Sequence, residues 1–382
     1  MPHANKKMIS FFLTTKCNLC CRYCYNAWER NMIEEKTLPL EIAYAGINWY
    51  FSSQDSRHIR FYGPGEPTQE FTKLKEITRY ARSYEDGGER VTVEIQTNGI
   101  FTEDVRRWIL DNVNIVWMSF DGMPNIQNFN RPLNPKYKKI FNNQSSAVVI
   151  EKNTRWLIEN ITNQDLMVGA RATITNENIA RQVEMVDYFA SLGIRYVWTD
   201  PLFASVGTCP VCADHEKVPL HFDMDAYIDN HLKASLYAKS KGVFWKSFFS
   251  VNFDGQSPYH CRCCTPLSAP HLTPDGYISS CDMVVLGERP YHMSPFIVGK
   301  WNPDNQKFEM DEQKIFVLRQ RNSTNMIHCK ECPVKLHCGG YCLGETLNET
   351  GNLFGQNIEK CKAIIKLFEN EGICPPYEYL HP

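Results

Sequence analysis

Residues 8–24 read MISFFLTTKCNLCCRYC, an apolar run followed at once by closely spaced cysteines. Cys17, Cys21 and Cys24 stand in the spacing C-x3-C-x2-C, and the run Met8–Leu13 is typical of a buried β-strand. In a parallel α/β fold, the loop after such a strand lies at the end of the sheet where reactive sites are assembled. We therefore expect the three thiols to line a reactive site.

The spacing of these cysteines indicates an iron–sulfur cluster. Three thiolate ligands on a [4Fe–4S] cube leave one iron free, and the amino and carboxylate groups of S-adenosylmethionine can chelate that iron. The pattern therefore predicts radical chemistry. The alternatives are a zinc knuckle with a fourth ligand elsewhere and a redox-active thiol pair.

The composition is that of a globular chain larger than one average domain. It has 382 residues, 43% of them apolar, and a formal charge of −2. We expect two structural units and, because no block of Lys or Arg stands out, neither a nucleic acid nor a membrane as a partner. No stretch approaches about 18 uninterrupted apolar residues, so we expect a cytoplasmic protein. In that reducing compartment, metal ligation explains sixteen cysteines better than disulfides do.

Strand-like runs alternate with helix-like segments from Met8 to Phe203, which favours a parallel α/β sheet. Six strands are expected, with helices in most of the intervals between them. The expected strands are Met8–Leu13, His58–Tyr62, Val91–Thr97, Val113–Ser119, Leu166–Thr173 and Arg195–Thr199. Six units rather than eight predict a partial (β/α)6 barrel of the TIM type. Such a barrel is incomplete, and we expect an opening wide enough for a large molecule to enter.

The pattern changes beyond the last expected strand. We assign residues 1–215 to the partial barrel and residues 216–254 to a bridging region with a helix at Met224–Lys241. Residues 255–382 are rich in Cys, Gly, Pro and Asn, the profile of a loop-rich domain held by metal rather than by a large core.

A second set of ordered cysteines lies in this C-terminal part. A G-x4-C pattern ends at Cys281, and a C-x2-C-x5-C-x3-C run extends from Cys329 to Cys342. The whole set is Cys261, Cys263, Cys264, Cys281, Cys329, Cys332, Cys338, Cys342 and Cys361. Eight of these thiolates would satisfy two four-ligand clusters, and structural zinc sites are the alternative.

With these two cysteine sets, the chain resembles the radical S-adenosylmethionine (radical SAM) superfamily. Its C-terminal half resembles the SPASM extension of peptide and protein maturases such as the anaerobic sulfatase-maturating enzymes. The resemblance implies three [4Fe–4S] clusters. One would bind S-adenosylmethionine and be held by Cys17, Cys21 and Cys24. Of two auxiliary clusters, the first would be held by Cys261, Cys264, Cys281 and Cys342, with Cys263 able to replace either neighbour, and the second by Cys329, Cys332, Cys338 and Cys361.

The same resemblance implies a binding surface for S-adenosylmethionine. Tyr23 would rest near the adenine. The motif Gly63-Pro64-Gly65-Glu66-Pro67 resembles the Gly-Gly-Glu-Pro motif that accepts the methionine ammonium, which assigns Gly65, Glu66 and Pro67 to that group. Pro64 replaces a glycine and removes one backbone N–H, but the carbonyls and Glu66 remain as acceptors.

Further residues of this expected surface end the later strands. Ser119 and Asp121 resemble the segment that contacts the ribose, although a Ser-x-Asp at a strand end is otherwise an ordinary turn. Gln96 and Asn98 close the third strand near the same pocket. Arg171 stands where the family often has a carboxylate-binding arginine, and a charged side chain within an apolar strand needs such a partner.

Asp282 is the candidate catalytic base. The sulfatase-maturating enzymes carry an Asp in the same Cys-Asp dipeptide, where it serves as base. Burial near a cluster would raise the pKa of this carboxyl toward a useful value. The alternative is an Asp that only accepts hydrogen bonds from nearby backbone N–H groups.

The resemblance implies a maturase that acts on a peptide or protein. Reductive cleavage of S-adenosylmethionine would give a 5′-deoxyadenosyl radical that abstracts hydrogen from a side chain or Cα, followed by oxidation or crosslinking to a thioether, a carbon–carbon bond or formylglycine. The electron donor would be a flavodoxin or ferredoxin. Because only sixteen residues precede Cys17, we expect no leader-binding domain here, and a separate peptide-recognition protein is one possible partner. The alternatives are a radical SAM dehydrogenase of a small-molecule alcohol or amine and a non-enzymatic zinc scaffold.

Overall fold

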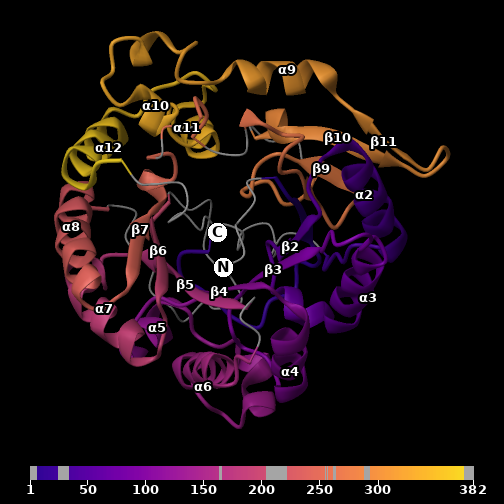
Figure 1. The fold of residues 1–382 in the computed structure, drawn as a ribbon, viewed down its shortest axis with the longest axis horizontal. Coiled ribbons are helices and arrows are strands. Elements are labelled where there is room, and N and C mark those ends of the chain that lie inside the picture. The colour runs from indigo at the N-terminus through magenta and orange to yellow at the C-terminus, as the bar shows by residue number, and fades with distance from the viewer. Residues whose placement is uncertain are drawn as a thin grey trace.

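The computed structural model describes residues 7–24, 34–162, 166–203, 222–253, 255, 257–260, 264–287 and 293–373. Within these residues the strands form a single sheet of eleven strands, in the order β11-β10-β9-β8-β1-β2-β3-β4-β5-β6-β7. Helices form a ring outside the strands (Figure 1). The sheet thus curves inside a helical layer, as in a TIM-like barrel.

The six strands expected from the sequence are all confirmed. They are β1 (Ile9–Phe12), β2 (His58–Tyr62), β3 (Thr92–Thr97), β4 (Ile115–Ser119), β5 (Met167–Ile174) and β6 (Tyr196–Pro201). Each pairs in parallel with the next. Every residue of β1, β2 and β4 is buried, because these parallel strands are covered on both faces.

The outer layer consists of amphipathic helices between the strands. In α4 (Glu103–Asn112), Val105 and Ile109 are buried, while Glu103 and Arg107 form an exposed ion pair one turn apart. The other long helices of this layer are α2 (Leu40–Ser53), α3 (Phe71–Arg82), α6 (Ser146–Glu159), α7 (Gln182–Ser191) and α8 (Met224–Ser240), and α5 (Pro124–Asn130) is short. Short 3-10 helices include η1 (Pro67–Glu70) and η2 (Pro135–Phe141).

Two strands that the sequence did not predict extend the parallel part of the sheet. β7 (Phe244–Ser247) pairs with β6, and β8 (His271–Leu272) pairs with β1. The expected bridging region therefore supplies a strand, and the C-terminal part supplies the neighbour of β1. The six-stranded barrel is flanked on each edge by a strand from outside it.

The rest of the C-terminal part lies across the top of the ring in Figure 1. It begins with the antiparallel strands β9 (Tyr277–Ser279), β10 (Ile297–Asn302) and β11 (Lys307–Met310). The helices α9 (Glu312–Gln320), α10 (Lys335–Cys338), α11 (Leu343–Thr350) and α12 (Ile358–Glu371) follow, and α12 packs beside α8.

One continuous apolar core joins both parts of the chain. It includes Phe11 and Trp117 of the barrel together with Leu343 and Leu367 of the C-terminal helices, all almost fully buried. Among the described residues, no helix is both long enough and apolar enough to cross a membrane.

Candidate active site

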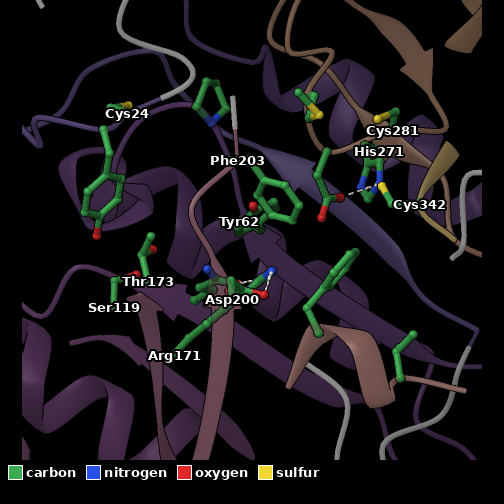
Figure 2. A pocket seen from close by; sticks show the side chains of 18 of the residues that line it. Cys24, Tyr62, Ser119, Arg171, Thr173, Asp200, Phe203, His271, Cys281 and Cys342 are labelled. Carbon is green, nitrogen blue, oxygen red and sulfur yellow. Dashed lines mark hydrogen bonds and ion pairs between the residues drawn. The ribbon is translucent and has the colours of Figure 1, made fainter. Parts of the chain in front are cut away.

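A cavity of about 470 Å³ lies at the C-terminal ends of the parallel strands and is lined by both parts of the chain. Figure 2 shows Cys24 on one side of it and Cys281 and Cys342 on the other, with the paired side chains of Arg171 and Asp200 between them. This is the end of a parallel barrel at which reactive sites are built.

Cys17, Cys21 and Cys24 all line this cavity, as the first loop of the barrel was expected to do. The end of β3 holds the loop that carries them. Asn98 Nδ2 donates to Cys17 Sγ at 3.8 Å and to Asn18 Oδ1 at 2.7 Å. These contacts fix the position of the first thiol relative to the sheet.

The turn Gly63–Pro67 packs against the loop that carries the triad. The Glu66 backbone N–H donates to Lys16 O at 2.7 Å, and a Cβ on Gly65 would come within 2.2 Å of that oxygen, so only glycine permits the approach. The buried Glu66 carboxylate accepts from Thr68 N and Oγ1, from Thr97 Oγ1 at 2.7 Å and from Asn98 N at 2.7 Å. Burial raises the pKa of Glu66, although these hydrogen bonds oppose the shift. Gly65 and Glu66 line the cavity, whereas Pro67 begins η1 and does not.

Asp121 contacts three residues that line the cavity. Its Oδ2 accepts from Tyr23 OH at 2.6 Å and pairs with Arg131 Nε at 3.0 Å, while Oδ1 accepts from Thr173 N at 3.0 Å. Tyr23, Arg131, Thr173 and Ser119 line the cavity, but the fully buried Asp121 does not. Burial raises the pKa of Tyr23 well above its usual value. The carboxylate of Asp121 therefore acts on the cavity through its neighbours.

The charged side chain of Arg171 has a partner within the chain. Arg171 Nε donates to Asp200 Oδ2 at 2.6 Å, and its Nη1 donates to Gln96 Oε1 at 2.9 Å. Gln96 Oε1 also accepts from the buried Arg60 at 3.0 Å. Burial lowers the pKa of Arg171, but Asp200, Tyr62 and Asp282 together raise it by more, so the guanidinium stays charged. All three residues of the Arg171–Asp200–Gln96 group line the cavity.

Asp282 is paired with a histidine that the sequence did not single out. Asp282 Oδ1 lies 2.8 Å from His271 Nε2, and the His271 ring stacks on Phe12 at 5.1 Å between centroids. His271 is buried, whereas the Asp282 side chain is 37% exposed and lines the cavity. The expectation of a raised pKa for Asp282 is wrong. Burial does raise the pKa, but His271 and the nearby arginines Arg60 and Arg171 lower it by more.

The C-terminal cysteines gather at two places. Cys281 and Cys342 line the main cavity, and a Cβ on Gly344 would lie 2.7 Å and 3.9 Å from their sulfurs. Cys264 is fully buried, and Cys261 lies outside the described residues. A second cavity of about 320 Å³ is lined by Cys329, Cys332, Cys338 and Cys361. Burial raises the pKa of Cys329 to about 11 and that of Cys338 further.

Residues 11–197 match the model of the Radical SAM superfamily. This part of the chain is a radical SAM domain. The chain is similar, at 24% identity over 348 residues, to a serine-type anaerobic sulfatase-maturating enzyme of Klebsiella aerogenes, covering 88% of this chain and 79% of the relative.

Two solved structures share the fold of this chain. Native anSMEcpe with bound AdoMet has a TM-score of 0.71 at 16% identity, covering 95% of this chain and 96% of that one. Streptococcus suis SuiB bound to S-adenosylmethionine has a TM-score of 0.63 at 13% identity, covering 94% and 78%. Both alignments extend through the C-terminal part as well as the barrel.

The radical SAM family implies S-adenosylmethionine and a [4Fe–4S] cluster, and the residues present fit both. Cys17, Cys21 and Cys24 offer three thiols at one side of a cavity, the donor set that leaves one iron open. Asn98 supplies the hydrogen bond to sulfur that commonly surrounds such ligands. The cavity beside them is polar where Ser119 and Arg171 lie, as a nucleoside with charged ends requires.

Proposed function

We propose that this enzyme is a maturase that modifies a side chain or Cα of a peptide or protein by oxidation or crosslinking. One observation carries the proposal. A single cavity extends from Cys17, Cys21 and Cys24 to Cys281, Asp282 and Cys342, so a substrate residue within it can be reached from both sides. The named relatives support a peptide as the substrate, because the solved structures include anSMEcpe with a Cp18Cys peptide and SuiB with its precursor peptide SuiA.

Three groups of cysteines are the candidate cluster ligands. The triad Cys17, Cys21 and Cys24 would hold the cluster that binds S-adenosylmethionine. Cys264, Cys281 and Cys342 would hold the first auxiliary cluster together with Cys261, and the four cysteines of the second cavity would hold the other. Three cubes correspond to about twelve irons per chain, which iron analysis of the reconstituted protein measures.

Residues around the triad are suited to hold S-adenosylmethionine. Arg171 would donate to its carboxylate and Ser119 to its ribose, while the turn at Gly65 supplies backbone acceptors for the ammonium group. Bound there, cluster and nucleoside would supply the radical chemistry that removes a hydrogen atom from the substrate. The walls of the cavity then keep water away from the reactive carbon.

Asp282 is our candidate for the proton acceptor. A substrate that has lost a hydrogen atom becomes a stable oxidised or crosslinked product by losing one electron and one proton. The first auxiliary cluster, which Cys281 and Cys342 would help to hold, would accept the electron. His271 holds Asp282 Oδ1, which leaves Oδ2 available to a substrate in the cavity. The contact with His271 would fix the direction in which this second oxygen points.

The Asp282→Asn variant tests this role. With dithionite, S-adenosylmethionine and peptides that carry a sulfatase-type Cys or Ser, we expect it to form 5′-deoxyadenosine while product formation falls by about 100-fold, the usual effect of losing a general base. Mass spectrometry of the peptide and chromatography of the nucleoside measure the two yields. The matched control is Asp304→Asn, which removes an exposed carboxylate from the β10–β11 turn.

Two outcomes would count against the proposal. Normal product from Asp282→Asn would remove this residue from the mechanism. Formation of 5′-deoxyadenosine by a Cys17→Ala variant at the wild-type rate would remove the triad, and with it the radical chemistry. Failure of every peptide together with oxidation of a small alcohol or amine would assign the cavity to a small-molecule substrate.

A further inference from the structure

A patch of unneutralised positive charge follows α5. The sequence contains no Asp or Glu from residue 122 to residue 150, and η2 carries Lys136, Lys138 and Lys139, all exposed. Among the described residues no ion pair involves these three lysines. Ile140, next to them, is 59% exposed. We call these four residues the lysine patch.

Seven other lysines of the described chain are paired with carboxylates. These ion pairs are Lys7–Asp55, Lys16–Glu70, Lys241–Asp187, Lys246–Glu371, Lys314–Asp311, Lys360–Glu345 and Lys366–Asp229. What distinguishes Lys136, Lys138 and Lys139 is that three such charges lie together on one short helix, in a chain whose formal charge is only −2. Positive charge around an exposed apolar side chain is the composition of a docking surface for an acidic partner.

The segment that leads into the lysine patch pairs with the loop that carries the triad. Leu19 forms a β-bridge with Leu133, and Asn134 N donates to Asn18 O at 3.0 Å. Tyr137 of η2, between Lys136 and Lys138, is close enough to Cys17 for that thiol to affect its pKa, after the larger effects of burial and Glu35. The patch thus adjoins the segment that pairs with the loop of the triad.

The proposed radical chemistry consumes one electron at the triad. Reductive cleavage needs one electron at the cluster of Cys17, Cys21 and Cys24, and the electron must come from outside the chain. Small redox partners use weak, limited interfaces in which complementary charge brings the two proteins together. The carboxylate of Glu70 is already paired with Lys16. The carboxylate of Glu35 is close enough to Tyr137 of η2 to raise the pKa of that phenol.

We propose that the lysine patch docks an acidic one-electron carrier protein of the flavodoxin or ferredoxin type, which reduces the cluster behind it. This inference rests on the proposed cluster of the triad but not on the identity of the substrate. The carrier approaches at Lys136, Lys138 and Lys139, and Ile140 makes the apolar contact. Because the attraction is between exposed charges, binding weakens as salt is added.

The test compares two reductants. In Lys136→Glu/Lys138→Glu/Lys139→Glu, we expect reduced flavodoxin to drive 5′-deoxyadenosine formation about tenfold more slowly or worse, as lost electrostatic steering does. Dithionite, which needs no docking surface, should give the wild-type rate. Isothermal titration calorimetry at low and high salt measures the affinity for flavodoxin, and ferredoxin is tested in parallel. The matched control is Lys233→Glu/Lys239→Glu/Lys307→Glu, an equal charge change on α8 and β11.

The outcomes separate the possibilities. Equal carrier-driven rates in the patch variant and the wild type would overturn the proposal, as would a wild type that binds neither carrier. A variant that is also slow with dithionite would show damage to the triad loop rather than loss of docking, and would overturn it too. Loss of peptide product with normal 5′-deoxyadenosine formation would assign the patch to the substrate. Failure of the maturase proposal leaves carrier-driven cleavage of S-adenosylmethionine intact, so the two failures are distinguishable.

Discussion

The sequence predicts that Arg171 has a partner but does not identify it. A charged side chain in an apolar strand predicts a partner, but the partner could be identified only from the register of the strands. Thr173 of β5 lies opposite Asp200 of β6, which brings Asp200 within 2.6 Å of Arg171 Nε. His271 was missed for a related reason, because a two-residue strand has no periodicity that a sequence could display.

The Asp200→Asn variant tests whether the pair orients the arginine toward a carboxylate. We expect its Kd for S-adenosylmethionine to rise about tenfold, since a weakened charge-assisted hydrogen bond costs roughly 1.5 kcal/mol. Its Kd for 5′-methylthioadenosine, which lacks the carboxylate, should not change. Calorimetry gives both constants, and Asp187→Asn, a carboxylate of an exposed pair, is the control. An equal loss for both nucleosides would contradict a role at the carboxylate.

At the scale of elements, the regular barrel was predictable and its edges were not. Repeated apolar runs predicted β1 to β6 with errors of at most two residues at their ends. β7 and β8 have only four and two residues, too few to show a periodicity, and only their pairing with β6 and β1 identifies them as strands. The grouping of Cys329, Cys332, Cys338 and Cys361 around one cavity agrees with the spacing pattern, and their role as ligands stays a prediction.

Helix α12 is attached to the barrel by a buried carboxylate. Glu371 Oε1 lies 3.3 Å from His231 Nε2 of α8, and Glu371 Oε2 lies 3.1 Å from Lys246 Nζ of β7. Burial raises the pKa of Glu371, but His231 and Lys246 lower it by more, to about 2. The ionised carboxylate therefore stabilises the folded chain and keeps α12, which carries Cys361, against α8.

Replacement of Glu371 by Gln should lower the free energy of unfolding by about 2 to 3 kcal/mol near neutral pH. An unfolded glutamate titrates near pH 4.3, so the stabilisation is complete above about pH 5 and is lost as the pH falls toward 2. The difference in thermal midpoint between wild type and variant should therefore shrink on acidification. Glu369→Gln, an exposed neighbour on α12, is the control. A difference that grows toward low pH would contradict the assignment.

At the scale of the whole molecule, the two parts of the chain share one sheet and one core. β8 covers the edge of β1, where Met8 N donates to Ser268 O at 3.0 Å and Ser10 N to Pro270 O at 2.9 Å. Phe12 packs in a buried cluster with Val285 and Leu286 of the C-terminal part. The sequence divides into a barrel and a later domain by its composition. In the structure, however, β1 contacts residues far beyond the expected boundary.

This arrangement predicts that the barrel does not fold alone. A fragment of residues 1–253 lacks β8 and α12, so it leaves an apolar edge strand unpaired and uncovers the face of α8 that contacts α12. We expect the fragment to aggregate or to unfold without cooperativity, as judged by size-exclusion chromatography and thermal melting, and co-expression of residues 254–382 should restore a compact species. A monomeric fragment with a sharp transition would mean that β1 tolerates an open edge. In that case the C-terminal part would be an independent domain that contributes its cysteines but not the stability of the sheet.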